Sequence, residues 1–379
     1  MTRSEKKKRY DGMLIFVVLL LVAAGLVILY STSAYNGQVK FHDPFHYLKK
    51  QGFATLLGLF GMALIARVDY HKWVPLAIPA YVTSIILSVA VIFFGDEYNG
   101  SKRWLSLGPI SFQPSEFAKV AVIFFLACLV SRNVQRMKRF RTMILMMIPV
   151  LPIVGLVGAS NLSTAIIILG IAVVLIFVAD PKYVRFILMG SIGVGFMTVF
   201  LAMESYRLER LAIWRHPEQY EKGYQTLQGL YAIGSGGLFG RGLGNSVQKL
   251  GFLPEAQNDM IFSIICEELG LIGAGFIILL FLILIWRFFV ISTKASDLLG
   301  ALIAAGAMAH MMIQVILNIA VVTNSIPNTG ITLPFISYGG TSVVFLLLEM
   351  GLVLSVSNYE GLRYGGSESV SYTHLRAHE

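Results

Sequence analysis

Cysteine and charge are both scarce in this sequence. Only two of the 379 residues are cysteines, Cys128 and Cys266, and both lie inside apolar runs. Two isolated thiols of this kind argue against a disulfide framework and against a metal site. Charged residues make up 13% of the chain and hydrophobic residues 56%, which excludes an ordinary soluble protein. The net charge of +9 does not indicate a nucleic-acid partner, because the positive residues cluster at the ends of apolar runs.

The chain also lacks the alternation of apolar and polar residues that is typical of membrane barrels. It has instead continuous apolar stretches of roughly 17–25 residues, the length that a helix needs to cross a bilayer. The first stretch has no cleavage site of small residues, so we interpret it as a retained helix. We predict an all-α integral membrane protein, a polytopic bundle of about ten transmembrane helices. The predicted spans are 13–32, 51–66, 73–94, 115–131, 142–158, 162–179, 184–203, 260–286, 297–322 and 335–357.

Lysine and arginine predict the orientation of this bundle. They are concentrated in residues 3–9, before the first span, and in residues 132–141, after the fourth. By the positive-inside rule both segments are cytoplasmic, which also places both termini in the cytoplasm. The predicted plan is a basic N-terminus, a transmembrane domain, a cytoplasmic tail without periodicity, and a large extracellular loop between spans seven and eight. These parts cover residues 1–12, 13–358, 359–379 and about 204–259, respectively.

The large loop carries the most unusual composition. Between residues 223 and 270 it is rich in glycine and then in polar residues, up to Asp259. Glycine-rich backbone can expose its N–H groups to an anion, although no preceding strand supports a nucleotide loop. The structural alternative is an irregular loop packed on helix ends, with Asp259 capping a helix that starts at Met260. The functional interpretation is an acid at the water-facing mouth of a membrane helix.

Several charged side chains fall inside predicted spans, where they are costly. Glu116 and Lys119 are three residues apart and share a helix face. They form either a mutually neutralising pair or part of a substrate cavity. Glu267 and Glu268 leave two alternatives open. Either one of them lines the cavity while the other contacts another helix, or both bind Lys119. Two lone polar groups deeper in the spans are His310, interpreted as a core histidine, and Glu349.

Several motifs occur in a fixed order along the chain: Lys102-Arg103-Trp104, Gly108-Pro109, Phe112 to Glu116, Ala232 to Gly237, Gly244-Asn245-Ser246, Pro254 to Asp259 and Leu333 to Gly340. On these motifs the chain resembles the SEDS family, the FtsW/RodA/SpoVE group of peptidoglycan glycosyltransferases, over residues 10–362. Within the group it is more similar to the FtsW and SpoVE branch. The sequence departs from the family pattern at residues 159–164 and at Gln257-Asn258.

The resemblance implies an activity and a location. It implies polymerisation of lipid II, an undecaprenyl-pyrophosphate-linked disaccharide peptide, into β-1,4-linked glycan strands. The reaction would occur at the outer face of the bacterial cytoplasmic membrane, for cell division or related septal wall synthesis. It also implies a class B penicillin-binding protein and other membrane proteins of the divisome as partners. Two alternatives are a lipid II flippase or transporter, with a site near the bilayer midplane, and a non-catalytic division scaffold, which needs no acid at the cavity mouth.

The resemblance also implies roles for individual residues. Asp259 matches the family's catalytic aspartate, and glycosyl transfer needs a base to take the proton of the acceptor hydroxyl. The departing pyrophosphate needs positive charge or a metal ion, so a divalent cation, Mg²⁺ or Mn²⁺, is a candidate cofactor, with no metal ligand assigned. The candidate cations of the protein are Lys102, Arg103, Lys119, Arg241 and Lys249. The remaining expected substrate contacts are Gln113, Ser115, Glu116, Ser235, Gly236, Ser246 and Glu255.

Overall fold

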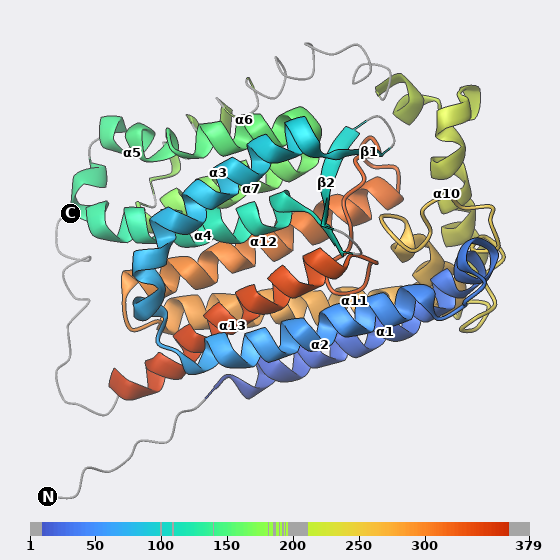
Figure 1. Cartoon of the computed structure of the whole chain (residues 1–379), viewed down its shortest axis with the longest axis horizontal. Coiled ribbons are helices and arrows are strands. Elements are labelled where there is room, and N and C mark those ends of the chain that lie inside the picture. The colour runs from blue at the N-terminus through green and yellow to red at the C-terminus, as the bar shows by residue number, and fades with distance from the viewer. Residues whose placement is uncertain are drawn as a thin grey trace, which may run out of the picture.

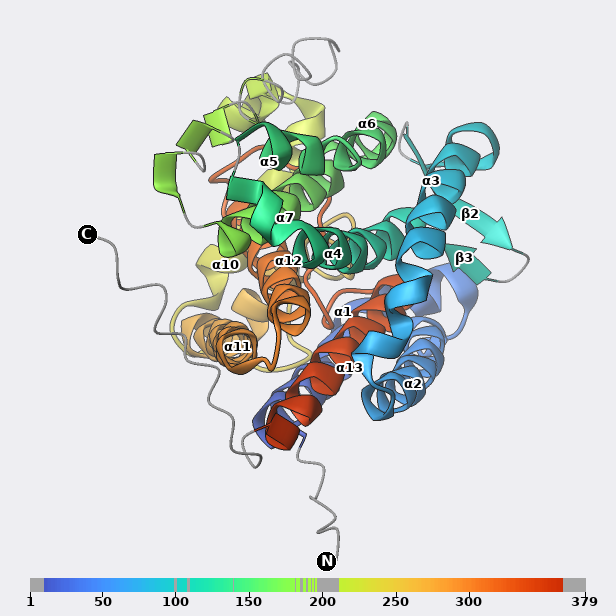
Figure 2. The same cartoon turned by 90° about the vertical axis from the view of Figure 1, so that its left-hand side faces the viewer.

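A bundle of long apolar helices forms the body of the molecule (Figures 1 and 2). The computed structural model describes residues 10–98, 101–107, 110–138, 140–180, 211–363 and parts of 182–195. The helices within these ranges are α1 (Gly12–Phe41), α2 (His46–Arg67), α3 (Ala77–Phe94), α4 (Pro114–Asn133), α5 (Phe140–Met147), α6 (Val150–Ser160), α7 (Leu162–Ala179), α10 (Tyr224–Gly236), α11 (Ile261–Lys294), α12 (Leu298–Val322) and α13 (Gly340–Arg363).

The described helices confirm a polytopic membrane protein. Seven of them are long and apolar enough to cross a bilayer, or eight if α5 and α6, bent by 41° at their junction, form one broken span. The count of ten stays a prediction, since most of the predicted span 184–203 lies outside the described residues. The predicted span 162–179 coincides with α7. α1 was predicted to end at residue 32 but continues to Phe41, where His42 closes it in a left-handed conformation (φ 55°).

A small antiparallel sheet lies at the end of the bundle near α10 (Figure 1). Its strands β1 (Asp96–Tyr98), β2 (Ser101–Leu107) and β3 (Ile110–Phe112) are ordered β1-β2-β3. The connection between α3 and α4 contains these strands, and the all-α description is therefore incomplete. Two of the three strands have only three residues, which is too short for a period-2 pattern to stand out in the sequence.

Small residues allow close helix packing in the core. A Cβ on Gly351 of α13 would lie 2.9 Å from the carbonyl oxygen of Met62 on α2, and a Cβ on Gly25 of α1 would lie 2.4 Å from that of Phe335. Such close approach of backbones is how membrane helices gain packing energy without a hydrophobic effect between them. The central helix is α12, which packs against α7, α4, α11 and α13.

Helix α11 is interrupted at Gly270, whose backbone (φ 67°, ψ −170°) is not helical. The interruption frees backbone groups that a glycine-rich segment then satisfies. The N–H of Arg241 donates to the carbonyl of Glu267, and the N–H of Gly242 donates to that of Glu268, both at 2.9 Å. The expected irregular loop is thus partly ordered, because α10 occupies residues 224–236 and the following segment packs into the break.

Candidate active site

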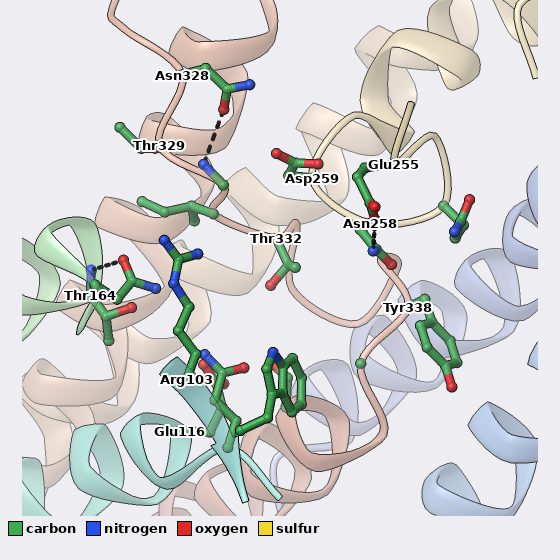
Figure 3. Close-up of a pocket in the computed structure, with 18 of the residues that line it drawn as sticks. Arg103, Glu116, Thr164, Glu255, Asn258, Asp259, Asn328, Thr329, Thr332 and Tyr338 are labelled. Carbon is green, nitrogen blue, oxygen red and sulfur yellow. Dashed lines mark hydrogen bonds between the residues drawn. The ribbon is translucent and has the colours of Figure 1, made fainter. Parts of the chain in front are cut away.

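A cavity of about 630 Å³ opens at the end of the bundle that carries the sheet and α10. It is lined by β2, the first turns of α4, the connection between α12 and α13, and the residues just before α11 (Figure 3). Its charged lining residues are Lys40, Asp96, Arg103, Glu116, Lys119, Lys222, Glu255 and Asp259. Both signs of charge therefore meet in one partly enclosed space, where electrostatic interactions are stronger than in bulk water.

Asp259 lies in the cavity wall with its carboxylate facing the interior (Figure 3). The side chain amide of Asn318 donates to its backbone carbonyl at 2.9 Å. The N-cap position of α11 is occupied by Met260 and not by Asp259, so the capping alternative is wrong. The acid is buried, at 8% exposure, and its position is held through its backbone.

Arg103 reaches the cavity from β2. Its Nε donates to the carbonyl of Ser160 at 3.2 Å, which fixes the guanidinium against the end of α6. Gly330 lies between this arginine and Asp259: a Cβ built on Gly330 would be 3.5 Å from Arg103 Nη1 and 3.8 Å from Asp259 Oδ2. The backbone of Gly330 is left-handed (φ 68°), a conformation that glycine adopts without strain. A glycine here keeps the space between acid and guanidinium open.

Glu116 and Lys119 lie at the start of α4 and are both buried. Lys119 Nζ is 3.0 Å from Glu116 Oε1 and donates to Gln314 Oε1 at 2.9 Å. The two alternatives for this pair turn out to be compatible, because the charges neutralise each other and both side chains line the cavity. Burial of this kind is tolerated only for charges that are paired and hydrogen-bonded.

Sequence reasoning missed several further lining residues, among them Asn161, Trp214 and Gln314. Asn161 caps α7, accepting the N–H of Thr164 at 3.3 Å. Trp214 donates from Nε1 to the carbonyl of Asn324 at 2.9 Å. Gln314 carried a usable signal, a polar residue one helical turn after His310 in an apolar span. Gln225 and Tyr338 also line the cavity.

Several expected substrate contacts lie outside the cavity lining. Lys102 precedes Arg103 on β2, and successive strand side chains point to opposite faces. Gly236 packs against α11, where a Cβ would meet the carbonyl of Cys266 at 1.9 Å. The full set outside the lining is Lys102, Ser115, Ser235, Gly236, Arg241, Ser246 and Lys249, whereas Arg103, Gln113, Glu116, Lys119, Glu255 and Asp259 line it.

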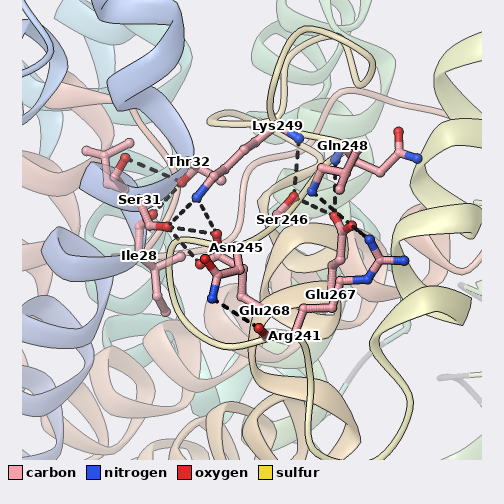
Figure 4. Close-up of polar contacts among 12 residues, drawn as sticks. Ile28, Ser31, Thr32, Arg241, Asn245, Ser246, Gln248, Lys249, Glu267 and Glu268 are labelled. Atoms are coloured by element: carbon pink, nitrogen blue, oxygen red, sulfur yellow. Dashed lines mark hydrogen bonds and ion pairs between the residues drawn. The ribbon is translucent and has the colours of Figure 1, made fainter.

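Glu267 and Glu268 hold the glycine-rich segment (Figure 4). Glu267 accepts the N–H of Val247 at 3.1 Å and also the hydroxyl of Ser246, and it lies 3.5 Å from Arg241 Nη1. Glu268 accepts from Lys249 at 2.6 Å and from Ser31 of α1 at 2.7 Å. The expectation that these acids bind Lys119 is wrong, and neither lines the cavity. Contact of Glu268 with another helix is confirmed.

No group of three or more His, Cys, Asp or Glu side chains among the described residues could hold a metal ion. Magnesium, however, is commonly bound by one or two carboxylates together with substrate phosphates. Asp259 and Glu255 are cavity carboxylates from the same segment. They fit that kind of shared site better than a cage formed by the protein alone.

The arrangement matches known proteins over nearly its whole length. A family model for FtsW, RodA and SpoVE, described as "Cell cycle protein", matches residues 11–361. Stage V sporulation protein E of Bacillus subtilis (strain 168) is 40% identical, over 93% of this chain and 98% of its own length. A probable peptidoglycan glycosyltransferase FtsW of Geobacter sp. (strain M18) is 35% identical, over 92% of this chain and 96% of its own.

Solved structures show the same fold. A chain from a structure that describes the coordination of polymerization and crosslinking by a peptidoglycan synthase complex superposes with a TM-score of 0.77 at 30% identity, covering 93% of this chain and 98% of its own. The rod shape determining protein RodA of Thermus thermophilus superposes with a TM-score of 0.69 at 30% identity, covering 93% of this chain and 97% of its own. The chain belongs to the FtsW/RodA/SpoVE family of cell cycle proteins.

Proposed function

We propose that this chain is an inverting peptidoglycan glycosyltransferase that polymerises lipid II into β-1,4-linked glycan strands. The observation that carries the proposal is a buried carboxylate, Asp259, that lines the same cavity as Arg103 and Lys119. A relative that is 35% identical is named as a probable enzyme of this class. We place the reaction at the outer face of the cytoplasmic membrane of a dividing bacterium, with both termini in the cytoplasm.

Asp259 acts as the base in this proposal. The acceptor sugar hydroxyl attacks the anomeric carbon of the donor, and its proton passes to the Asp259 carboxylate as the new C–O bond forms. The bond between the anomeric carbon and the pyrophosphate oxygen breaks, and the electron pair leaves with the pyrophosphate. A single displacement converts the donor's α linkage into a β linkage.

Arg103 and Lys119 stabilise the leaving pyrophosphate. Preorganised cations aimed at developing negative charge are usually the largest contribution to such catalysis. Arg103 is held by Ser160, and Lys119 by Glu116 and Gln314, so neither has to reorganise during the reaction. Any Mg²⁺ or Mn²⁺ would be shared between substrate phosphates and the carboxylates of Asp259 and Glu255.

The substitution Asp259→Asn tests the proposal directly. It removes the charge while preserving size, and losing a general base typically costs about 10²–10⁴-fold in rate. The measurement is glycan polymerisation from purified lipid II in detergent or vesicles, with and without EDTA. Ser235→Ala, outside the cavity, is the matched control and should polymerise normally. Near-normal polymerisation by a well-folded Asp259→Asn protein would rule out Asp259 as the base.

We further propose a class B penicillin-binding protein as partner, because polymerised strands must be cross-linked and the chain matches a subunit of a peptidoglycan synthase complex over 93% of its length. Co-expression of the two proteins should yield a complex in detergent with a higher polymerisation rate than this chain alone. Equal rates and no complex on size exclusion would argue against this partner.

A further inference from the structure

Three polar residues form a stripe along α12. His310, Gln314 and Asn318 are spaced four apart, so they lie on one face of the helix, and all three are buried. Each makes hydrogen bonds to other elements of the bundle. Polar side chains inside a membrane span are expensive unless they are satisfied, and a continuous stripe of them on the central helix indicates a purpose beyond packing.

Gln314 and Asn318, the last two members of the stripe along the chain, bond to residues that line the cavity. Asn318 donates to the carbonyls of Asp259 at 2.9 Å and Ile331 at 2.7 Å. Gln314 donates from Nε2 to the carbonyl of Thr332 at 3.1 Å and accepts from Lys119 at 2.9 Å. The stripe therefore contacts both the proposed base and one of the proposed pyrophosphate-binding cations.

These partners determine the orientation of the Gln314 amide. A backbone carbonyl can only accept, so the NH₂ group must face Thr332, and a lysine ammonium can only donate, so the oxygen must face Lys119. The same oxygen is 2.9 Å from His310 Nε2. His310 Nε2 must therefore carry a hydrogen, since two acceptors cannot share this contact.

The other imidazole nitrogen decides the state of Glu349 on α13. His310 Nδ1 is 2.8 Å from Glu349 Oε2, while the buried Glu349 Oε1 has no hydrogen-bond partner among the described residues. If the carboxyl group were ionised, Oε1 would carry part of the negative charge in a buried position without a hydrogen-bond donor, which is costly. A neutral carboxyl group satisfies the geometry, with Oε2–H donating to Nδ1 and Oε1 as an unpaired carbonyl oxygen.

We propose that His310 and Glu349 form a neutral hydrogen-bonded pair that positions Lys119 for substrate. The proton on Glu349 forces the Nε2–H tautomer of His310, this tautomer holds the Gln314 oxygen in place, and that oxygen fixes the Lys119 ammonium in the cavity. His310, Gln314 and Glu349 are positioning residues, since none of them except Gln314 lines the cavity. The role assigned to Lys119 rests on the proposed function, whereas the state of the pair does not.

The state of the pair can be measured on the whole protein without substrate. Solid-state NMR of protein labelled with ¹⁵N-histidine in lipid bilayers distinguishes the two neutral tautomers from imidazolium, and loss of a signal in His310→Gln identifies the resonance. We expect the neutral Nε2–H tautomer at neutral pH. An imidazolium signal, or the Nδ1–H tautomer, would overturn the inference.

The positioning role is tested by two substitutions of Glu349. Glu349→Gln keeps a donor toward Nδ1 and should leave KM for lipid II and kcat near wild type. Glu349→Ala removes that donor, frees the imidazole to change tautomer, and should lower kcat about ten-fold with a smaller effect on KM, because Lys119 acts on charge that develops on the leaving pyrophosphate. Ser355→Ala, on the same helix but bonded only to the carbonyl of Val68, is the control.

The outcomes separate the inference from the proposed function. Equal loss of activity in Glu349→Gln and Glu349→Ala, or an unchanged kcat in a folded Glu349→Ala protein, would contradict the positioning role. If the wild-type protein fails to polymerise lipid II, the proposed function fails, while the NMR measurement still decides the state of His310 and Glu349.

Discussion

At the scale of single residues, this protein places charges where membrane proteins usually exclude them and matches almost every one with a partner. The Lys249–Glu268 pair is the clearest case, with side chains only 7% and 2% exposed and an N–O distance of 2.6 Å. The Lys49–Asp43 pair is almost as short, at 2.8 Å, but the lysine side chain is 69% exposed. The two ion pairs therefore have similar N–O distances but differ in burial.

These two pairs give a prediction for stability. Lys249→Met leaves Glu268 charged and buried, and removing one partner of a buried pair costs about 3–5 kcal/mol. Lys49→Met, the control, should cost far less, because an exposed pair contributes little to stability. The double substitution Lys249→Met with Glu268→Gln should recover much of the loss. Thermal unfolding in one detergent measures all three, and a Lys249→Met protein as stable as Lys49→Met would contradict the importance of burial.

At the scale of elements, the break in α11 links the cavity to the glycine-rich segment. The carbonyls of Glu267 and Glu268 and the N–H groups of Leu271 and Ile272 all bond to residues 237–242. The side chains of the same two glutamates hold residues 246–249. Main chain and side chains thus fasten one segment to the short N-terminal part of α11, directly after Asp259. Glu267 and Glu268 therefore fix the glycine-rich segment at the start of α11 without lining the cavity.

A second element, the connection between α12 and α13, forms another part of the cavity wall, next to the Asp259 segment. Ser337 donates to the carbonyl of Asn258 at 2.6 Å, and the N–H of Tyr338 donates to that of Gln257 at 2.9 Å. Irregular backbone at this depth is tolerated in a membrane protein only where it is buried in protein or lines a water-filled space. Here it does both.

At the scale of the whole molecule, the distribution of lysine and arginine gives a prediction for the orientation in the membrane. Ser235→Cys and Gln135→Cys place single exposed thiols at opposite ends of the bundle, and both native cysteines are buried. The positive-inside rule predicts that an impermeant maleimide labels position 235, but not position 135, in intact cells. Labelling should become equal after permeabilisation. Reaction at 135 with protection of 235 would reverse the orientation and move the cavity to the cytoplasmic face.

The amino-acid sequence by itself determined the class of protein, most helix positions and the acid at the mouth of α11. These are local properties. A helix in lipid satisfies its own backbone hydrogen bonds, so a membrane span is recognisable in the sequence as a continuous apolar run. The pairing of Glu116 with Lys119 was also accessible, since both lie on one helix face. The motifs were enough to identify the family.

Only the tertiary structure decided which distant residues meet. Nothing in the sequence separates Glu268, bound to Ser31 and Lys249, from Glu116, which lines the cavity. Helix periodicity indicates which side chains share a face, but the partner of that face depends on how helices cross and how loops return. The roles of Gln314 and Asn161 were missed for the same reason: each polar side chain is satisfied by a backbone group or charge that only the packing of the bundle brings within reach.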